Sequence, residues 1–582
     1  MRENPIRPIL VVPHAAAAGG ADDRTWMARD LEALAGRTHD VVIVGGGISG
    51  ACVAWDAVLR GLTVVLLEQG DFGEATSANS QKIVHGGFRY LQHGDVRRMR
   101  HSIGERRILL RVAPHLVHPL PVLLPTLRRG LQRRGIMGAA LALYDLIAWD
   151  RNRGLRDPQQ RIPPSRLISR DECVARIPGL PGEGIIGGAV WYDGRIEHPE
   201  RLTLAFLRSA AARGAAAANY AQVTGFLRDG RRVQGVRVLD RLTGRTLDVR
   251  GRLVINTSGP WVNRVLGLTT ERLRIPLAFS KTISLVLARA LTNGDAVSLP
   301  TSDGRRLFFV PWRGGTLAGS SHRLAEQDGA VQAVTDDELD ELLREINAVY
   351  PDAGVRRGDV TAILAGLLPL EPRGGQEDPA LLTGRYQIRD HGREDGVPGL
   401  LSVVSVKYTT ARRVAEEAVT RALRLLGRRV VPSRSAMEPL WGGAIARRDA
   451  FLDGAAHAGS HGLDAETMRR LAEIYGSAYG EVLRWIDAEG RLARCLSPRT
   501  PVLGAEVIHA VREEMAQTLA DVVLRRTTLG TFGHPGREAL EVAASLMAEA
   551  LCWDAGRTRQ ELEAVEAALA ARGARPSRES VR

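Results

Sequence analysis

Residues 40–50 read DVVIVGGGISG, and this stretch decides the fold around which the rest of the chain is built. Val41 to Val44 is an apolar run typical of a buried strand, and the glycines that follow, Gly45, Gly47 and Gly50, are spaced G-x-G-x-x-G. Glycines at this spacing let the backbone turn tightly and approach a pyrophosphate, while the next helix points its N-terminal amides at that anion. The stretch therefore predicts the start of a dinucleotide-binding domain.

A second apolar strand strengthens this prediction. Thr63 to Leu67 forms it and is followed by Glu68, 18 residues beyond Gly50. A carboxylate in this place accepts hydrogen bonds from the adenosine ribose hydroxyls, which favours FAD or NAD over NADP. A glycine triad alone is a weak signal in a chain with 62 glycines, but strand, loop, helix, strand and acid in this order are specific.

Size and composition predict a globular protein of two or three domains. The chain has 582 residues, of which 44% are apolar and 25% charged. The net charge of +13 permits nucleic acid, an anionic membrane surface or an anionic substrate as partner, or only a solvated basic surface. The four cysteines lie far apart, so we expect no disulfide framework, no metal site and a reducing, cytoplasmic location.

Only three of the 79 basic residues are lysines: Lys82, Lys281 and Lys407. In a chain that uses arginine almost everywhere, a retained ammonium suggests a need for a compact point charge, although chance retention is an alternative. All three lie in segments that we assign to the active site on other grounds.

Two segments bear on location in the cell. The apolar run at 9–18 is interrupted by Pro13 and His14, so we do not expect a secretion signal. No uncharged apolar run in the sequence is long enough to span a bilayer. An apolar helix expected at 136–149 follows four arginines at 128–134; it either lies in a membrane interface with the arginines on lipid phosphates, or packs on the core with a solvated arginine end.

The block at 76–91, TSANSQKIVHGGFRYL, carries the most specific signal. It resembles the segment after the nucleotide motif in FAD-dependent glycerol-3-phosphate dehydrogenases of the aerobic type, which belong to the D-amino-acid-oxidase-type flavoprotein superfamily. TSGPW at 257–261, SVKYTT at 405–410 and the helical segments at 512–516 and 524–526 resemble further blocks of that family. The resemblance covers the chain from Asp40 to about Leu569.

The resemblance implies an α/β fold in which a discontinuous Rossmann-type FAD-binding domain carries an antiparallel-sheet substrate lobe and a C-terminal helical domain. We expect an N-terminal extension with a lead-in helix at 1–38, the oxidoreductase domain at 39–432 with its lobe at about 262–360, the helical domain at 433–570 and a tail at 571–582. Alternating apolar residues predict strands at 188–192, 223–227, 233–239, 253–256, 273–289, 306–312, 316–321 and 400–404.

The implied activity belongs to glycerol metabolism: FAD-dependent oxidation of sn-glycerol 3-phosphate to dihydroxyacetone phosphate, with electrons passed to a quinone or another acceptor. The resemblance implies FAD as cofactor, a small anionic substrate, a homodimer as one permitted assembly, and a cytoplasmic enzyme that can lie peripherally on the cytoplasmic face of the inner membrane. We expect no nucleic-acid partner, because the sequence has no RNA-binding module and no basic patch interleaved with aromatic residues.

Five residues are the expected substrate-site groups. Arg89 is suited to bidentate binding of a phosphate or carboxylate, Tyr90 adds a phenolic donor, and Lys407 adds a point charge near the flavin edge. His85 and His322 are alternative proton acceptors. By resemblance, the cofactor contacts are Gly45, Gly47, Gly50, Glu68, Ser77, Ser80, Lys82, His85, Gly86, Val223, Ser258, Gly259, Lys407, Tyr408 and Thr409.

Four departures from the family pattern affect the substrate site. Ser284 replaces a histidine that could bind phosphate or act as base, and Leu368 replaces a guanidinium expected to hold the substrate anion. Loss of one charge-assisted contact costs about 1.5 to 3 kcal/mol of affinity. His322 ends a GSSH sequence where the family has Gly-Thr-Thr-Asp, and it is a candidate to take over from the missing histidine. Ser405-Val406 replaces a Gly-Gly pair before the lysine.

These departures keep other functions open. An enzyme of the same fold could oxidise a different anionic hydroxy acid or an amine. A non-catalytic flavin-binding scaffold is a second alternative, and the charge alone would also allow a flavoprotein that acts on nucleic acid.

Overall fold

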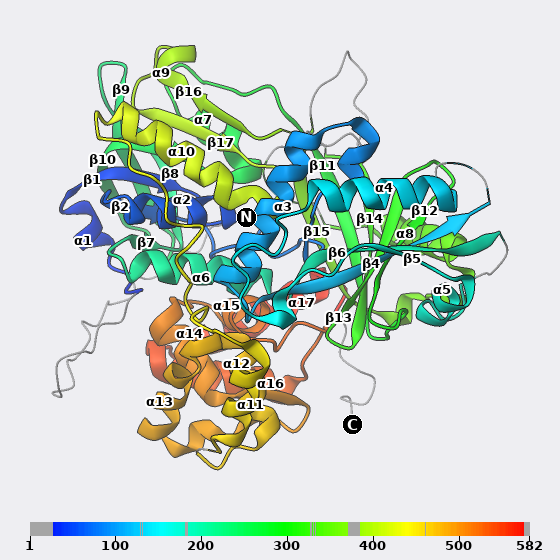
Figure 1. The fold of residues 1–582 in the computed structure, drawn as a ribbon. Helices are drawn as coiled ribbons and strands as arrows, with labels where there is room; N and C mark the ends of the chain where they lie inside the picture. The colour runs from blue at the N-terminus through cyan, green and yellow to red at the C-terminus, as the bar shows by residue number, and fades with distance from the viewer. Residues whose placement is uncertain are drawn as a thin grey trace.

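The computed structural model describes residues 27–574 apart from 129, 131, 181–183, 326–328, 330, 332, 371–384 and 460. Most of the expected N-terminal extension and the end of the expected tail lie outside the described residues. Two large sheets and a group of C-terminal helices form the molecule, with most of these helices below the first sheet in the view of Figure 1.

The first sheet is the one that the glycine motif predicts. Its order is β16 (Gln387–Asp390), β17 (Leu400–Val404), β10 (Thr246–Asn256), β1 (Thr38–Val44), β2 (Val64–Leu67) and β7 (Ala216–Ala218), with the hairpin β8 (Ala221–Asp229) and β9 (Arg232–Asp240) attached to β10. Strands β17, β10, β1, β2 and β7 are parallel. The strands expected at 223–227, 233–239, 253–256 and 400–404 are confirmed.

Both faces of this sheet are covered, which explains why its central strand is an unbroken apolar run. Val41 and Ile43 point into a core shared with α2 (Ile48–Leu59), α6 (Pro199–Ala211) and α10 (Ala411–Leu425). Val42 and Val44 point into the opposite core, which the β8–β9 hairpin, α1 (Leu31–Ala35) and α7 (Val262–Leu266) help to close. Helix α1 is the described part of the expected lead-in helix.

The second sheet contains the expected substrate lobe but is wider. Its order is β15 (Val360–Leu370), β11 (Ala278–Leu287), β14 (Gly315–Leu324), β13 (Arg306–Trp312), β12 (Ala296–Pro300), β4 (Val117–Leu127), β6 (Ile185–Ile196) and β3 (Ile83–Val84), with β5 (Arg166–Ile168) beside β6. Pairing is antiparallel except between β12 and β4. The range of about 262–360 therefore omits β3 to β6, because these strands join the sheet from an earlier part of the chain.

Helices cover both faces of the second sheet. Helix α4 (Arg134–Ile147) packs on one face with Met137 and Leu141 in its core, while α5 (Arg170–Arg176) and α8 (Asp336–Val349) serve the other. Helix α3 (Val96–Val112) runs beside the first sheet and follows the short 3₁₀ helix η1 (Phe88–His93). None of the described helices is long and apolar enough to cross a membrane.

The C-terminal region is mostly helical and has a core of its own. It contains α11 (Arg448–His457), α12 (Ala465–Tyr475), α13 (Gly480–Ala488), the hairpin β18 (Cys495–Ser497) and β19 (Thr500–Leu503), α14 (Gly504–Glu514), α15 (Leu519–Asp521), η9 (Val522–Arg526), α16 (Arg537–Leu551) and α17 (Ala555–Ala571).

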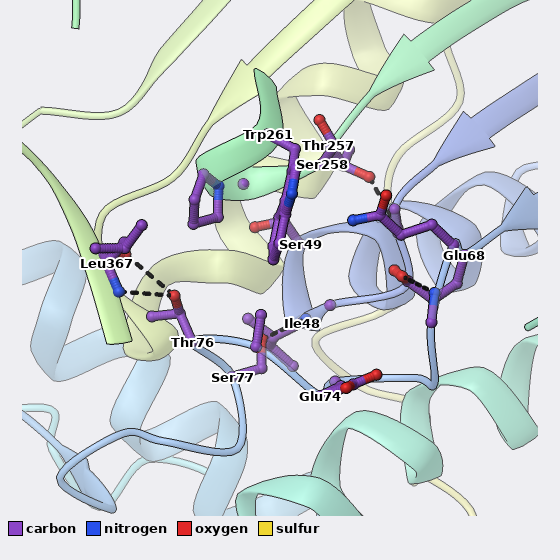
Figure 2. A pocket seen from close by; sticks show the side chains of 18 of the residues that line it. Ile48, Ser49, Glu68, Glu74, Thr76, Ser77, Thr257, Ser258, Trp261 and Leu367 are labelled. Atoms are coloured by element: carbon purple, nitrogen blue, oxygen red, sulfur yellow. Dashed lines mark hydrogen bonds between the residues drawn. The ribbon is translucent and has the colours of Figure 1, made fainter. Parts of the chain in front are cut away.

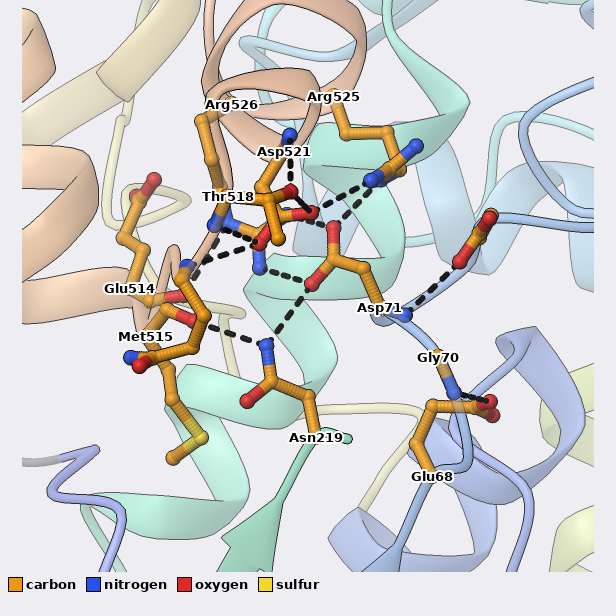
Figure 3. Close-up of polar contacts among 12 residues, drawn as sticks. Glu68, Gly70, Asp71, Asn219, Glu514, Met515, Thr518, Asp521, Arg525 and Arg526 are labelled. Carbon is orange, nitrogen blue, oxygen red and sulfur yellow. Dashed lines mark hydrogen bonds and ion pairs between the residues drawn. The ribbon is translucent and has the colours of Figure 1, made fainter. Parts of the chain in front are cut away.

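A buried charge cluster joins this helical region to the loop after β2 (Figure 3). The Asp71 carboxylate accepts hydrogen bonds from both terminal nitrogens of Arg526 at 2.6 Å, from Arg525 and, at 3.1 Å, from Asn219. Arg525 also donates to Asp521 at 2.7 Å. Burial opposes the charge of Asp71, but the two guanidiniums hold the pKa of this carboxyl well below its usual value. The cluster therefore fixes the loop after β2 to the C-terminal helices.

Candidate active site

A cavity of about 610 Å³ lies where β1, β2 and β10 end and where β15 of the second sheet approaches them (Figure 2). Its wall runs from Glu68 and Val223, through the glycine loop and Ser77, to Leu367 and Lys407. The carboxyl ends of parallel strands are the usual place for a ligand in such sheets. The geometry therefore locates the site at the edge of the first sheet, facing the substrate lobe.

The glycine loop is packed so closely that two of its glycines cannot be replaced without movement. A Cβ at Gly45 would lie 2.8 Å from the Thr257 carbonyl oxygen, and Gly45 has a φ of +106°. A Cβ at Gly50 would lie 1.9 Å from the Gly45 carbonyl oxygen. Helix α2 thus begins directly against the loop, and its N-terminus, capped at Ile48 N by Ser77 Oγ at 3.0 Å, carries partial positive charge toward the cavity.

Glu68 lines the cavity next to the glycine loop, and its contact with an adenosine ribose stays a prediction. Its carboxylate accepts hydrogen bonds from the amides of Gly46 at 2.6 Å and Gly70 at 2.9 Å. Burial, together with the charges of Glu74 and Asp71, raises the pKa of Glu68 to about 7 in spite of these two hydrogen bonds. The carboxyl group is therefore held in a fixed position on the cavity wall, where it can meet ribose hydroxyls.

The turn after β10 forms the facing wall. Ser258 donates to Asn256 Oδ1 at 2.6 Å, and Gly259 adopts a φ of +57°. Ser258, Gly259 and Trp261 line the cavity together (Figure 2). Gly47, Val223, Ser77, Ser80, Lys407 and Tyr408 also line it, so these predicted cofactor residues are brought together with Gly45 and Glu68.

Thr76 ties the first sheet to the substrate lobe, a role that the sequence does not predict. Its hydroxyl donates to the Leu367 carbonyl at 3.1 Å and accepts from the Leu367 amide at 3.2 Å (Figure 2). Gly366 allows this approach, because a Cβ there would lie 3.3 Å from the Thr76 methyl carbon. Strand β15 is thereby fixed along the cavity.

Of the predicted substrate groups, Lys407 lines the other end of the cavity, and Tyr90 and Arg89, which do not line it, lie close to Lys407. The Lys407 ammonium lies 4.2 Å from the centre of the Tyr90 ring, a cation–π distance. Burial, and then repulsion by Arg89, lowers the pKa of Lys407 to about 8. Arg89 itself is exposed. The arrangement concentrates positive charge next to a cavity that Lys407 lines.

His85 is held by a carboxylate that the sequence analysis missed. Its Nδ1 lies 3.2 Å from Oδ2 of the buried Asp193, and its backbone amide donates to Thr409 Oγ1 at 3.1 Å. Burial opposes the charge of Asp193, but the hydrogen bond and charge of His85, with help from Arg106, lower the pKa of this carboxyl. An ionised Asp193 therefore fixes the His85 ring through Nδ1, and Nε2 points away from this carboxylate. The only sequence signal for this role was that Asp193 is a single acidic residue near the end of the otherwise uncharged start of β6.

His322 lies on β14, opposite Thr282 of β11. Its ring nitrogens lie 3.1 Å from Ser320 Oγ and 3.4 Å from Ser280 Oγ. The neighbouring Ser284 is buried. His322 therefore sits among serine hydroxyls of the lobe, and its role as proton acceptor stays a prediction.

The other two lysines have partners away from the cavity. The ammonium of the buried Lys82 lies 4.4 Å from the centre of the Trp312 ring and 3.9 Å from Glu200. Lys281 forms an ion pair of 2.8 Å with Glu338. Neither residue lines the cavity, so the expectation that all three lysines serve the active site is supported by placement for Lys407 alone.

Gly86 and Thr409 also lie behind the cavity wall. A Cβ at Gly86 would lie 2.4 Å from the Tyr144 hydroxyl, so this glycine permits close packing. Thr409 is buried and holds His85, while the adjacent Tyr408 donates to the Pro199 carbonyl at 2.7 Å. For Lys82, His85, Gly86 and Thr409, direct contact with a cofactor stays a prediction.

The residues present fit FAD. The crowded glycine loop leaves room for a pyrophosphate only because side chains are absent, Glu68 offers a buried acceptor for a ribose, and the cavity continues from there to Lys407. An extended dinucleotide can span these points.

Comparisons with known proteins agree with this fit. The model of the FAD dependent oxidoreductase family matches residues 40–403, and that of the C-terminal domain of alpha-glycerophosphate oxidase matches 419–558. Glycerol-3-phosphate dehydrogenase of Synechocystis is 32% identical over 86% of this chain and 90% of its own, and the mitochondrial enzyme of Mus musculus is 32% identical over 90% and 72%.

A solved structure extends the agreement to three dimensions. The glycerol-3-phosphate dehydrogenase from Bacillus halodurans, complexed with FAD, superposes with a TM-score of 0.76 at 27% identity and covers 94% of this chain and 98% of its own. Family models, relatives and fold therefore agree over most of the chain, and the chain belongs to the FAD-dependent glycerol-3-phosphate dehydrogenase family.

Proposed function

We propose that this protein oxidises sn-glycerol 3-phosphate to dihydroxyacetone phosphate. The observation that carries the proposal is the concentration of Arg89 and Lys407 beside Tyr90, at the end of a cavity built for FAD. When bound, FAD supplies the hydride acceptor for the oxidation of the alcohol carbon. The chain's own residues bind the anion, orient the alcohol and remove its proton.

His85 is the better-supported proton acceptor. Asp193 bonds to Nδ1, which leaves Nε2 as the nitrogen that can accept a proton from the substrate hydroxyl. The carboxylate also stabilises the imidazolium that results. Arg89 and Lys407 hold the phosphate at one end of the substrate, and His85 meets the hydroxyl at the other, so the two contacts together orient the alcohol.

Anaerobic reduction of the purified flavoprotein tests the proposal. Glycerol 3-phosphate should bleach the flavin absorbance, whereas glycerol, which lacks the anion, should do so only at far higher concentration. Reduction by another hydroxy acid or an amine, but not by glycerol 3-phosphate, would instead support the alternative substrates. His85→Asn should slow bleaching at least 100-fold with FAD still bound. If His85→Asn bleaches at the wild-type rate and His322→Ala bleaches slowly, His322 is the proton acceptor instead.

We further infer that α4 docks on the cytoplasmic face of the inner membrane, where a quinone accepts the electrons. Ile136, Leu143, Leu146 and Trp149 expose apolar side chains there, and the last two are 71% and 72% exposed. In the sequence, Arg128, Arg129 and Arg133 precede this helix, and Arg134 begins it. Exposed apolar residues beside arginines suit an anionic lipid interface.

Vesicle flotation tests this contact. The protein should float with vesicles that contain anionic lipid, and the double variant Leu146→Ser, Trp149→Ser should lose at least tenfold in binding. Met437→Ser, which changes another exposed apolar side chain, is the matched control. Equal flotation of all three proteins would contradict docking through α4.

A further inference from the structure

Arg306 opens β13 with a half-buried guanidinium whose hydrogen-bond partners among the described residues are all neutral. Nε donates to Ser298 Oγ at 2.7 Å and Nη2 to the Ser298 carbonyl at 2.8 Å. The Gln132 side-chain oxygen, in the orientation that satisfies both of its amide atoms, accepts from Nη1 at 3.2 Å. The next residue contrasts with it, because Arg305 pairs with Asp303 at 2.6 Å and with Glu345. A partly buried cation without a counter-ion is costly unless something else compensates it.

Strand geometry directs Arg306 to the face of the sheet that carries His85. Arg306 and Phe308 are two residues apart in β13, so their side chains point to the same face. The Phe308 ring meets the His85 ring edge-on, with centres 6.2 Å apart. His85 leads directly into η1, which holds Arg89 and also Tyr90, the residue beneath Lys407. Arg306 therefore belongs to the surroundings of the substrate groups.

The charge of Arg89 links the other two cations. Burial, and then repulsion by Arg89, lowers the pKa of Arg306 to about 10, and the same two causes in the same order act on Lys407. Within the described part of the chain, no carboxylate forms an ion pair with any of the three. Positive charges that repel one another in the free protein are all stabilised when an anion binds among them.

We propose that Arg306 is a third anion-binding group of the substrate site, where it holds the substrate phosphate together with Arg89 and Lys407. Ser298 and Gln132 fix the guanidinium and leave one N–H on each terminal nitrogen, which is the pair that grips an oxyanion bidentately. Arg306 adds a positive charge to a lobe in which Leu368, on the cavity wall, stands where the family pattern has a guanidinium. This proposal deepens the proposed function and rests on it for the identity of the anion.

Arg306→Met, which keeps length but removes charge, tests the proposal in the FAD-loaded enzyme. The KM for glycerol 3-phosphate should rise 10- to 100-fold while kcat changes less than threefold. The dissociation constant of inorganic phosphate, followed by perturbation of the flavin absorbance, should rise by a similar factor. Arg305→Met is the matched control, because its guanidinium already has carboxylate partners, and it should leave both constants within twofold.

Two further variants separate binding from folding. Ser298→Ala removes one of the bonds that hold the guanidinium and should raise both constants several-fold, and Arg306→Lys should fall between wild type and Arg306→Met. The proposal is overturned if Arg306→Met keeps the wild-type KM and the wild-type dissociation constant of phosphate. If Arg306→Met does not fold, wild-type values of both constants in Ser298→Ala and Arg306→Lys overturn it. If glycerol 3-phosphate fails to reduce the wild type, the proposed function fails, but loss of phosphate binding in Arg306→Met still supports the anion site.

Discussion

Lys407 keeps a positive charge where both burial and a neighbouring guanidinium oppose it. Among the described residues, the ammonium gains only the face of Tyr90 in return, so the free site holds a cation that an incoming phosphate would stabilise. An arginine in its place would stay charged at any pH. At the scale of the single residue, this lysine therefore makes anion binding sensitive to pH.

We expect the KM for glycerol 3-phosphate to rise several-fold between pH 7 and 9, because Lys407 loses its proton near pH 8. The free energy of unfolding should depend on the same proton. Between about pH 8 and 10.5 the unfolded chain holds the Lys407 proton and the folded chain does not, so this residue makes the free energy of unfolding increase with pH. Steady-state kinetics and urea unfolding across this range measure the two slopes.

Lys407→Arg provides the control for this titration. Its KM should stay flat to pH 9, whatever its absolute value, because a guanidinium does not lose its proton there. A KM that rises equally in wild type and variant would assign the titration to another group.

At the scale of the element, the strand, loop and helix around the glycines act as one packed unit. Gly50 belongs to the first turn of α2, yet it touches the backbone of Gly45 in the loop before it. The helix can therefore point its N-terminus at a pyrophosphate only if position 50 has no side chain. Packing between neighbouring elements, not turn conformation alone, dictates this glycine.

Gly50→Ala should abolish FAD binding or weaken it at least 100-fold, because the added Cβ would sit 1.9 Å from the Gly45 carbonyl oxygen. Flavin content after purification and a fluorescence titration of the apoprotein measure the effect. Gly104→Ala in α3 is the control: nothing lies within 4 Å of a Cβ there, and the helix should gain about 0.5 to 1 kcal/mol. Full flavin content in Gly50→Ala would contradict this account of the loop.

At the scale of the whole molecule, the C-terminal helices hold the loop that follows Glu68 on the cavity wall. Asp71 lies between Gly70, which bonds to Glu68, and Arg526 of the helical region (Figure 3). The link joins residues 455 positions apart in the chain. Docking of the helices and retention of FAD should therefore be coupled.

Asp71→Asn should lower the free energy of unfolding by about 3 to 5 kcal/mol, the usual effect of leaving buried guanidiniums without their carboxylate. FAD should dissociate at lower urea in this variant, as followed by flavin fluorescence beside circular dichroism. Asp248→Asn breaks only an exposed pair with Arg237 and should cost about 0 to 1 kcal/mol. Unchanged FAD retention in Asp71→Asn would show that the two regions are not coupled.

The lowered pKa of Asp71 also sets the direction of the pH effect. Its ion pairs contribute stability that is fully present above the ordinary carboxyl pKa, near 4, and is lost as pH falls below it.

The sequence by itself determined the nucleotide-binding motif, the position of Glu68, most strands of the first sheet and four of the nine strands of the second. These follow from local patterns: an apolar run for a strand buried on both faces, alternation for a strand buried on one, and glycines where backbone must meet backbone. It also indicated Arg89 and Tyr90, because the block at 76–91 that contains them resembles a block of the glycerol-3-phosphate dehydrogenase family.

Only the tertiary structure decided which residues from elsewhere in the chain lie next to the block at 76–91. Asp193 reaches His85 from 108 positions away, and Arg306 faces the same side because β13 pairs with β12 in one register. The same long-range packing sends Lys82 to Trp312 and pairs Lys281 with Glu338. Contacts of this kind depend on how sheets and helices close on one another, and no local pattern in the chain encodes them.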